Sequence, residues 1–297
     1  MIKRLQLFIL SAILLLICGC SRSVEKCPIV ATTGPVYQFT QALCSGTDLK
    51  ASQLITDEVS CLHDYTLRVS QMQAVESAET VILSGAGLEE FMDDILSDIG
   101  TVIDSSVGIN VMSYGEDHDH DHEHEHSHEH HHEHDPHIWL SPENAMVMAQ
   151  NICQGLCSRY PAWSPVFQSN LVTLLDELEN LQTYGEEALS TLNCRELITF
   201  HDGFAYFAHS FDLEILEAVE EESGSEASAK ELKALISMVN EHNLPAIFTE
   251  INGSTSAAHV ISRETGAAVF ALDMAMVSDD YFQSMYRNID TIKEALG

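Results

Sequence analysis

Residues 166–192 read VFQSNLVTLLDELENLQTYGEEALSTL, and the organisation of the chain follows from them. Their apolar side chains recur at the spacing of a helix, with only Gly185 interrupting the pattern. Such a helix would extend about 40 Å. A helix of that length between two folded units can act as a stiff connection, so we expect two lobes joined by one long, rigid helix over residues 165–193.

The segments on both sides of this helix alternate between expected strands and expected helices. Before it, the pattern predicts strands at 28–33, 49–54 and 80–84 and helices at 36–44, 67–77, 88–95 and 142–160. After it, the pattern predicts strands at 196–200, 246–250 and 267–272 and helices at 204–211, 229–241, 256–265 and 280–296. We therefore expect an α/β fold, with a mostly parallel sheet flanked by helices in an N-terminal lobe (20–164) and again in a C-terminal lobe (194–297).

The first residues have the properties of an export signal. Two basic residues precede an apolar run over residues 5–18, which is too short for a membrane span. The run ends in ICGC at residues 17–20, which resembles the lipobox of bacterial lipoproteins. We expect residues 1–19 to be a signal peptide and Cys20 to be lipidated. The folded part would then work outside the cytoplasm, anchored to a membrane at the cell surface or in the periplasm.

The composition excludes one class of partner and favours another. Asp and Glu number 46 against 13 Lys and Arg, which gives a formal net charge of -33. This charge repels nucleic acid and anionic lipid headgroups, and it attracts cations. We therefore expect a cation as ligand and no nucleic acid.

The cysteines beyond the signal region leave two readings open. There are six: Cys27, Cys44, Cys61, Cys153, Cys157 and Cys194. In an oxidising compartment an even number suggests disulfides, but six cysteines allow fifteen connectivities and the sequence does not choose among them. Packing as small apolar residues is the alternative.

The segment from Glu116 to Asp135 is of low complexity. It interleaves nine acidic residues with ten histidines, which are His118, His120, His122, His124, His126, His128, His130, His131, His132 and His134. Since it holds no large apolar side chain, we expect a mobile loop that contributes nothing to a core. Weak imidazole and carboxylate sites would raise the local concentration of metal ions, and they would lose the metal as the imidazoles protonate. The alternative is a solvated tract with no role beyond its charge.

Three other histidines fall where loops at strand ends are expected. His63 follows the second predicted strand, His137 precedes a predicted helix, and His201 directly follows the strand at 196–200. Asp273 closes the strand at 267–272. Because parallel sheets place ligand sites at the carboxyl ends of their strands, these side chains can meet between the two lobes. Three neutral imidazoles and one carboxylate make up the tetrahedral shell that zinc prefers, whereas manganese favours more oxygen ligands.

Several stretches together resemble one protein family. They are HDY at 63–65, SGAGLE at 84–89, DPHIWL at 135–140, FHDGFAYF at 200–207, IFTE at 247–250, RETG at 263–266 and ALD at 271–273. In this order they are similar to the zinc-binding branch of the cluster A-I solute-binding proteins of ABC transporters, over essentially the whole mature chain. The resemblance implies two α/β lobes joined by a stiff helix, limited hinge motion, and an importer permease as partner. It also implies His63, His137 and His201 as histidine ligands and Asp273 as the carboxylate ligand of the transported Zn2+.

The sequence thus predicts a zinc-binding lipoprotein that delivers Zn2+ to an ABC importer, is a monomer and is not an enzyme. Transport of manganese or iron is the nearest alternative, although His201 stands where manganese binders usually carry a carboxylate. A surface adhesin is a second alternative, for which no adhesive repeat is present. A zinc hydrolase is a third, with Asp273 as base and Glu250 nearby, but outside the histidine-rich segment there is no HExxH motif.

Overall fold

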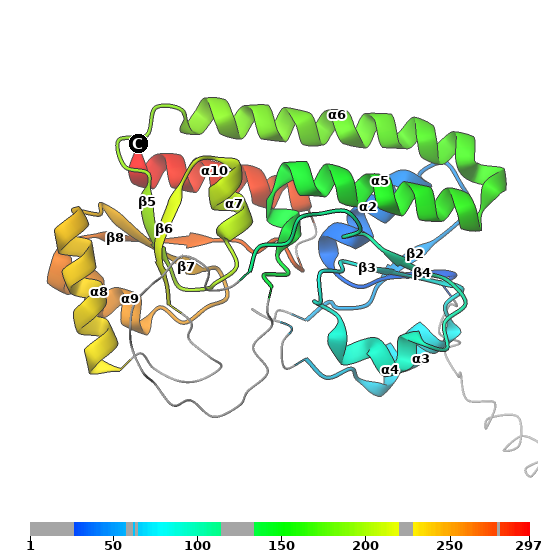
Figure 1. The fold of residues 1–297 in the computed structure, drawn as a ribbon, viewed down its shortest axis with the longest axis horizontal. Coiled ribbons are helices and arrows are strands. Elements are labelled where there is room, and N and C mark those ends of the chain that lie inside the picture. The colour runs from blue at the N-terminus through cyan, green and yellow to red at the C-terminus, as the bar shows by residue number, and fades with distance from the viewer. Residues whose placement is uncertain (1–26, 58–61, 63–64, 114–133, 220–227, 278–279) are drawn as a thin grey trace, which may run out of the picture.

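The computed structural model describes residues 27–57, 62, 65–113, 134–219, 228–277 and 280–297 (Figure 1). The expected signal peptide, Cys20 and His63 lie outside the described residues. So do nine of the ten histidines of the histidine-rich segment, all except His134.

Within these ranges the first lobe is built on a parallel sheet of four short strands in the order β2-β1-β3-β4. The strands are β1 (Ile29–Ala31), β2 (Ala51–Gln53), β3 (Thr80–Leu83) and β4 (Val102–Asp104). The helices around it are α2 (Gly34–Cys44), α3 (Val69–Ser77), α4 (Asp93–Leu96) and α5 (Pro142–Arg159), with the 3-10 turns η1 (Glu90–Met92) and η2 (Ile138–Leu140). The central strand β1 is entirely buried, as expected for a continuous apolar run covered on both faces.

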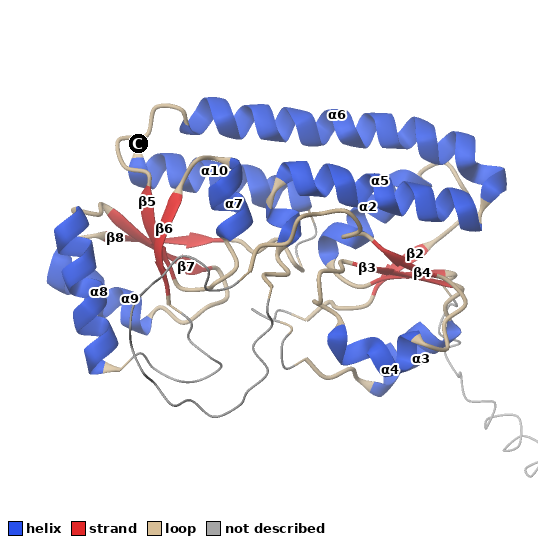
Figure 2. Cartoon of the chain, in the orientation of Figure 1, coloured by secondary structure: helices blue, strands red, loops and turns tan. Residues whose placement is uncertain are grey.

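The second lobe repeats this arrangement with the strand order β6-β5-β7-β8, again parallel. The strands are β5 (Glu196–Thr199), β6 (Glu214–Ala218), β7 (Ala246–Glu250) and β8 (Ala268–Leu272). The helices are α7 (Ala205–Ser210), α8 (Ala229–His242), α9 (Ser256–Thr265) and α10 (Tyr281–Leu296). Figure 2 shows the two sheets as separate groups of strands, with helices around each. The two-lobe α/β fold expected from the sequence is confirmed.

The connection between the lobes is helix α6 (Ser164–Leu189), which follows the 3-10 turn η3 (Pro161–Trp163). In Figure 1 it runs along one side of the molecule past both sheets. It packs on α5 and α2 of the first lobe and on α10 of the second. Its buried residues include Leu174, Leu178 and Leu181, the positions whose spacing predicts the helix.

The apolar core crosses from one lobe to the other. One cluster of buried side chains contains Ile29 and Phe39 of the first lobe, Leu178 of α6, and Tyr281 and Ile289 of α10. A second cluster lies within the C-terminal lobe, between its sheet and helices α8 and α9. Because the larger cluster is shared, separating the lobes would expose apolar surface to water.

Three details differ from the predicted elements. Strands β4 and β6 were not expected, and the helix predicted at 88–95 is instead the turn η1 followed by the short helix α4. Helix α6 ends at Leu189, whereas the pattern predicts a helix to residue 193. Both missed strands lie at an edge of their sheet and have two exposed residues each, so neither shows the apolar run that marks a buried strand.

The cysteines that the structure describes, Cys27, Cys44, Cys153, Cys157 and Cys194, are free thiols. Cys44 and Cys153 are buried in the shared apolar cluster, which agrees with their packing as small apolar side chains. Among the described residues, no helix combines the length and the apolar character that crossing a membrane requires.

Candidate metal centre

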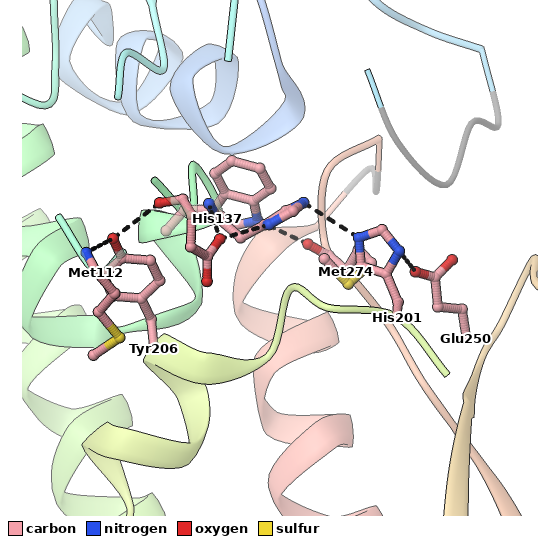
Figure 3. Close-up of polar contacts among 8 residues, drawn as sticks. Met112, His137, His201, Tyr206, Glu250 and Met274 are labelled. Atoms are coloured by element: carbon pink, nitrogen blue, oxygen red, sulfur yellow. Dashed lines mark hydrogen bonds and ion pairs between the residues drawn. The ribbon is translucent and has the colours of Figure 1, made fainter. Parts of the chain in front are cut away.

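His137 and His201 meet at the boundary between the two lobes (Figure 3). His137 directly precedes η2 of the first lobe, and His201 lies two residues beyond the end of β5 in the second. Their Nε2 atoms are 3.4 Å apart, and the two ring planes are nearly perpendicular, at 83°. The structure thus brings together one imidazole from each lobe, and their role as metal ligands stays a prediction.

Each imidazole is held on its other nitrogen by a carboxylate. His137 Nδ1 lies 2.8 Å from Asp135 Oδ1, and the same oxygen accepts a hydrogen bond from the backbone N–H of His137 at 2.9 Å. His201 Nδ1 lies 2.9 Å from Glu250 Oε1, at the end of the neighbouring strand β7. Asp135 and Glu250 are both buried, so these contacts are shielded from water.

The carboxylates determine what the two Nε2 atoms can do. A carboxylate accepts a hydrogen bond from Nδ1–H, which keeps the hydrogen of a neutral imidazole on Nδ1 and leaves Nε2 as an acceptor with its lone pair free. Two such acceptors that face each other at 3.4 Å cannot satisfy one another, and a cation between them satisfies both. Two nitrogens bound to one tetrahedral zinc are roughly 3.3 Å apart, given a Zn–N bond of about 2.0–2.1 Å. The spacing therefore suits zinc.

Burial and charge act in opposite directions on His201. Burial of the ring favours the neutral imidazole, but the hydrogen bond and the negative charge of Glu250 outweigh it, so the pKa of His201 lies above its ordinary value. The side chain of His201 is 17% exposed, whereas that of His137 is 2% exposed. The pair can thus be reached from solvent on the His201 side.

Gly203 makes room for the two rings. A Cβ atom at this position would lie 2.6 Å from His201 Cδ2, 2.6 Å from Met274 Cε and 3.0 Å from His137 Nδ1. Any larger residue would push one imidazole away. The glycine in FHDG at 200–203 is therefore needed for space at the site.

Asp273 lies at the end of β8, at the carboxyl edge of the second sheet, as the sequence predicts. Its Oδ1 accepts a hydrogen bond from Ala275 N–H at 2.9 Å, and its Oδ2 accepts one from the Ser284 hydroxyl at 2.7 Å. Within the part of the chain that the structure describes, no third His, Cys, Asp or Glu joins the histidine pair in a group able to hold a metal. The structure thus brings together His137 and His201, and it places Asp273 against α10.

The expectation for the last residue of the histidine-rich segment is wrong. Asp135 was expected to belong to a mobile loop without a buried part, but only 1% of its surface is exposed. Its backbone N–H donates to Met112 O at 2.8 Å, and Ser113 pairs with His134 in an antiparallel bridge. The physical reason is that Asp135 has a hydrogen-bonding partner inside the protein, the His137 imidazole, which a reading based on composition does not detect.

Two supporting residues could have been found in the sequence. Asp135 stands two residues before His137, and Glu250 ends the strand that pairs with the strand before His201. A metal-bound histidine commonly donates its second N–H to a carboxylate, so acidic residues at these two places are the expected signal. The other histidines are peripheral: His209 and His259 are exposed, and His242 pairs with Glu196 at the surface.

Comparison with known proteins finds relatives that are described as metal-binding or zinc-binding. Residues 29–295 match the family model of the zinc-uptake complex component A, periplasmic. A Treponema pallidum protein described as metal-binding is 26% identical over 91% of this chain and 87% of its own length. The zinc-binding protein AdcA of Streptococcus pyogenes is 27% identical over 90% of this chain. This chain spans only 56% of the length of that relative.

A solved structure shares the fold. The crystal structure of a ZnuA deletion mutant with zinc bound superposes with a TM-score of 0.75 at 29% sequence identity, covering 91% of this chain and 97% of the other.

Proposed function

Because the chain belongs to the zinc-uptake complex component A family, we propose that it is the extracytoplasmic solute-binding protein of an ABC importer. It captures Zn2+ between its lobes and delivers the ion to the membrane permease. The observation that supports this best is the pair of Nε2 atoms, 3.4 Å apart, which come from different lobes and are each held by a buried carboxylate.

The proposed ligands of the cargo are His63, His137, His201 and Asp273. The first three supply neutral imidazoles and Asp273 supplies one negative charge, which fits the tetrahedral coordination of zinc. The Asp273 carboxylate now contacts Ala275 N–H, the Ser284 hydroxyl and, at 3.6 Å, Arg287 Nη1. Each of its oxygens has a second lone pair with which to bind the ion.

Zinc is favoured over manganese by the residue at position 201. Harder ions prefer oxygen, and an imidazole stands here next to a second imidazole. Glu250 is the nearest carboxylate to His201, but it binds Nδ1, on the side of the ring away from His137. It therefore orients the ligand.

The same contact opposes a hydrolytic function. The members of this family are solute-binding proteins. The hydrolase alternative requires Asp273 as a free base with Glu250 nearby, whereas here Glu250 holds His201 and Asp273 holds Ser284. A shell of four protein ligands also leaves no position for an activated water.

Three finer features complete the proposal. Residues 1–19 direct export, and Cys20 carries a lipid that keeps the protein at the membrane. The ten histidines between His118 and His134 form weak secondary sites that collect zinc near the cleft. The protein works as a monomer and presents its loaded form to the permease.

The test is a zinc titration of the mature protein by calorimetry. We expect one tight site, which His63→Ala, His137→Ala or His201→Ala each abolishes, because removal of one imidazole leaves the ion with too few ligands. His209→Ala, at an exposed position on α7, is the control and should retain the site. Tight binding that survives all three ligand substitutions would overturn the proposal.

A further inference from the structure

A buried tyrosine joins the two lobes beside the histidine pair. Tyr206 lies on α7 of the second lobe, five residues after His201, and is 2% exposed. Its hydroxyl donates to the backbone oxygen of Asp135 at 2.9 Å and accepts from Met112 N–H at 2.8 Å. Figure 3 shows this hydroxyl on the opposite side of His137 from His201.

The two groups that Tyr206 binds belong to one small antiparallel pair of the first lobe. Asp135 N–H donates to Met112 O at 2.8 Å, and the next pair outward is Ser113 with His134. Tyr206 therefore holds both segments of this pair, at the point where the segment that contains Asp135 turns toward His137.

A continuous series of contacts leads from this hydroxyl to both imidazoles. On one side, Asp135 Oδ1 holds Nδ1 and the backbone N–H of His137. On the other side, the short segment from His201 to Tyr206 is fixed by Phe204 and Phe207, which are buried in the shared apolar cluster. The distance between the two Nε2 atoms thus depends on how the Tyr206 hydroxyl seats Asp135.

We propose that Tyr206 is a positioning residue of the metal site, whose hydroxyl sets the separation of His137 and His201 by holding Asp135 against the second lobe. This inference rests on the proposed function, since it names a determinant of affinity for the same ion. The aromatic ring supplies packing, which phenylalanine would retain. The hydroxyl supplies the two hydrogen bonds. Without it, Met112 N–H loses its acceptor on Tyr206, and the backbone oxygen of Asp135 loses its donor on Tyr206.

The experiment compares Tyr206→Phe with Tyr160→Phe in the mature protein. The Tyr160→Phe change removes a hydrogen bond of 3.0 Å between Tyr160 and Thr80. Thr80 is the first residue of β3, at the amino ends of the strands of the first sheet and away from the site. Zinc affinity is measured by competition with a chromophoric chelator, and the geometry is measured from the visible absorption of bound Co2+, which depends on the arrangement of its ligands. We expect Tyr206→Phe to weaken zinc about tenfold and to change the cobalt spectrum. Tyr160→Phe should do neither.

A double-mutant cycle tests the route. Asp135→Ala removes the carboxylate that holds His137 but keeps the backbone oxygen that Tyr206 binds. If Tyr206 acts through Asp135, then adding Tyr206→Phe to the Asp135→Ala variant lowers the zinc affinity by less than about a further twofold. Additive losses, or an unchanged affinity and cobalt spectrum in Tyr206→Phe, would overturn the inference.

Two outcomes separate this inference from the proposed function. If the wild-type protein binds no zinc, the proposed function fails. If the wild type binds zinc and Tyr206→Phe binds it equally well, only the inference fails. Circular dichroism establishes that each variant is folded. If Tyr206→Phe does not fold, Asp135→Ala tests the route from its other end, and an unchanged cobalt spectrum there contradicts the proposal.

Discussion

Among the residues that the structure describes, three imidazoles have a carboxylate beside Nδ1, and they differ in their burial and in what faces Nε2. His137, Asp135 and Glu250 are buried and His201 is half-buried, and the Nε2 atoms of the two imidazoles face each other. His242 with Glu196, at 3.0 Å, is more than one third exposed, and it lies at the end of α8. The third pair is thus a natural control for the first two.

We predict that Glu250→Gln weakens zinc binding by about tenfold to a hundredfold, because the amide removes the negative charge that makes His201 a better ligand. Glu196→Gln removes the same charge from the surface pair and should leave the affinity unchanged. Titration against a chelator of known affinity measures both. Equal affinities for the two variants would mean that Glu250 has no part in the metal site.

A different carboxyl group predicts a dependence of stability on pH. Glu89 is buried, and burial raises its pKa to about 7 from the ordinary 4.5, although the Thr32 hydroxyl and the backbone N–H groups of Ser84 and Gly85 act in the opposite direction. Its folded-state pKa lies above its unfolded-state pKa. The stability that it contributes is therefore complete below about pH 4.5 and is lost as the pH rises through about 7.

We predict that the melting temperature of Glu89→Gln, relative to that of the wild type, rises between about pH 5 and about pH 8, because the amide never ionises. The shift in pKa from 4.5 to about 7 corresponds to about 3 kcal/mol at most. Thermal unfolding of both metal-free proteins across this range measures the difference. Parallel curves would show that the pKa of Glu89 is the same in the folded and the unfolded protein.

At the scale of single residues, the sequence indicates the proposed ligands more clearly than the residues that hold them in place. His137 and His201 are visible because they follow or precede elements with clear periodicity. Asp135 lies in a run of acidic residues and looks like one more of them, and Tyr206 looks like an ordinary core aromatic. The role of Asp135 is indicated only by its place two residues before His137. The role of Tyr206 depends on a tertiary contact with Met112, which no local pattern encodes.

At the scale of elements, helix α6 contains a residue of low helix propensity, which tertiary packing requires. Gly185 interrupts an otherwise regular apolar pattern, and glycine is among the poorest helix formers. The structure gives the reason: a Cβ atom here would lie 2.2 Å from Phe211 Cε1 and 2.6 Å from Phe211 Cζ. Phe211 is buried and packs against Phe207, with ring centroids 4.9 Å apart, so it has little freedom to move.

We predict that Gly185→Ala destabilises the protein by about 1–3 kcal/mol, although the same change at an exposed helix position stabilises by up to about 1 kcal/mol. Thr183→Ala, at an exposed position in the same turn, is the control and should be neutral or slightly stabilising. Denaturant unfolding of the two variants measures both effects. A stabilised Gly185→Ala would show that Phe211 yields at little cost.

The elements that the sequence predicts well are those with a long or strongly apolar pattern. Strands β1, β3, β5, β7 and β8 and helix α6 are of this kind. The edge strands β4 and β6 are short and half exposed, and they form because β3 and β5 offer a free edge. Such pairing is a property of the assembled sheet, so single-sequence periodicity does not detect it.

At the scale of the whole molecule, the lobes are joined by more than α6. Trp139 Nε1 of the first lobe donates to Met274 O of the second at 2.7 Å, and Tyr281 Oη donates to Trp139 O at 2.8 Å. Gly34 N–H donates to Met276 O at 2.7 Å. Together with the shared apolar cluster, these bonds oppose large rotation of one lobe against the other. The histidine pair is therefore held at a fixed boundary, as limited hinge motion requires.

The contacts between the lobes also let us predict how zinc affinity changes when the histidine-rich segment is shortened. Ser113 pairs with His134 near the end of this segment, and Asp135, its last residue, is held by Met112 and Tyr206. The contacts that orient His137 and His201 thus come from outside residues 116–133. We predict that replacing residues 116–133 by a short Gly-Ser turn leaves one tight zinc site, with its affinity changed less than about threefold, and removes the weaker sites.

Calorimetric titration of the two proteins measures both affinity and stoichiometry, and His137→Ala in the shortened protein is the control that should bind no zinc tightly. The deletion must stop before Asp135, because a longer one would remove the partner of His137 and weaken the tight site for a different reason. If the shortened protein loses its tight site while Asp135 is retained, the segment itself holds the metal. The pair formed by His137 and His201 would then not be the centre of binding.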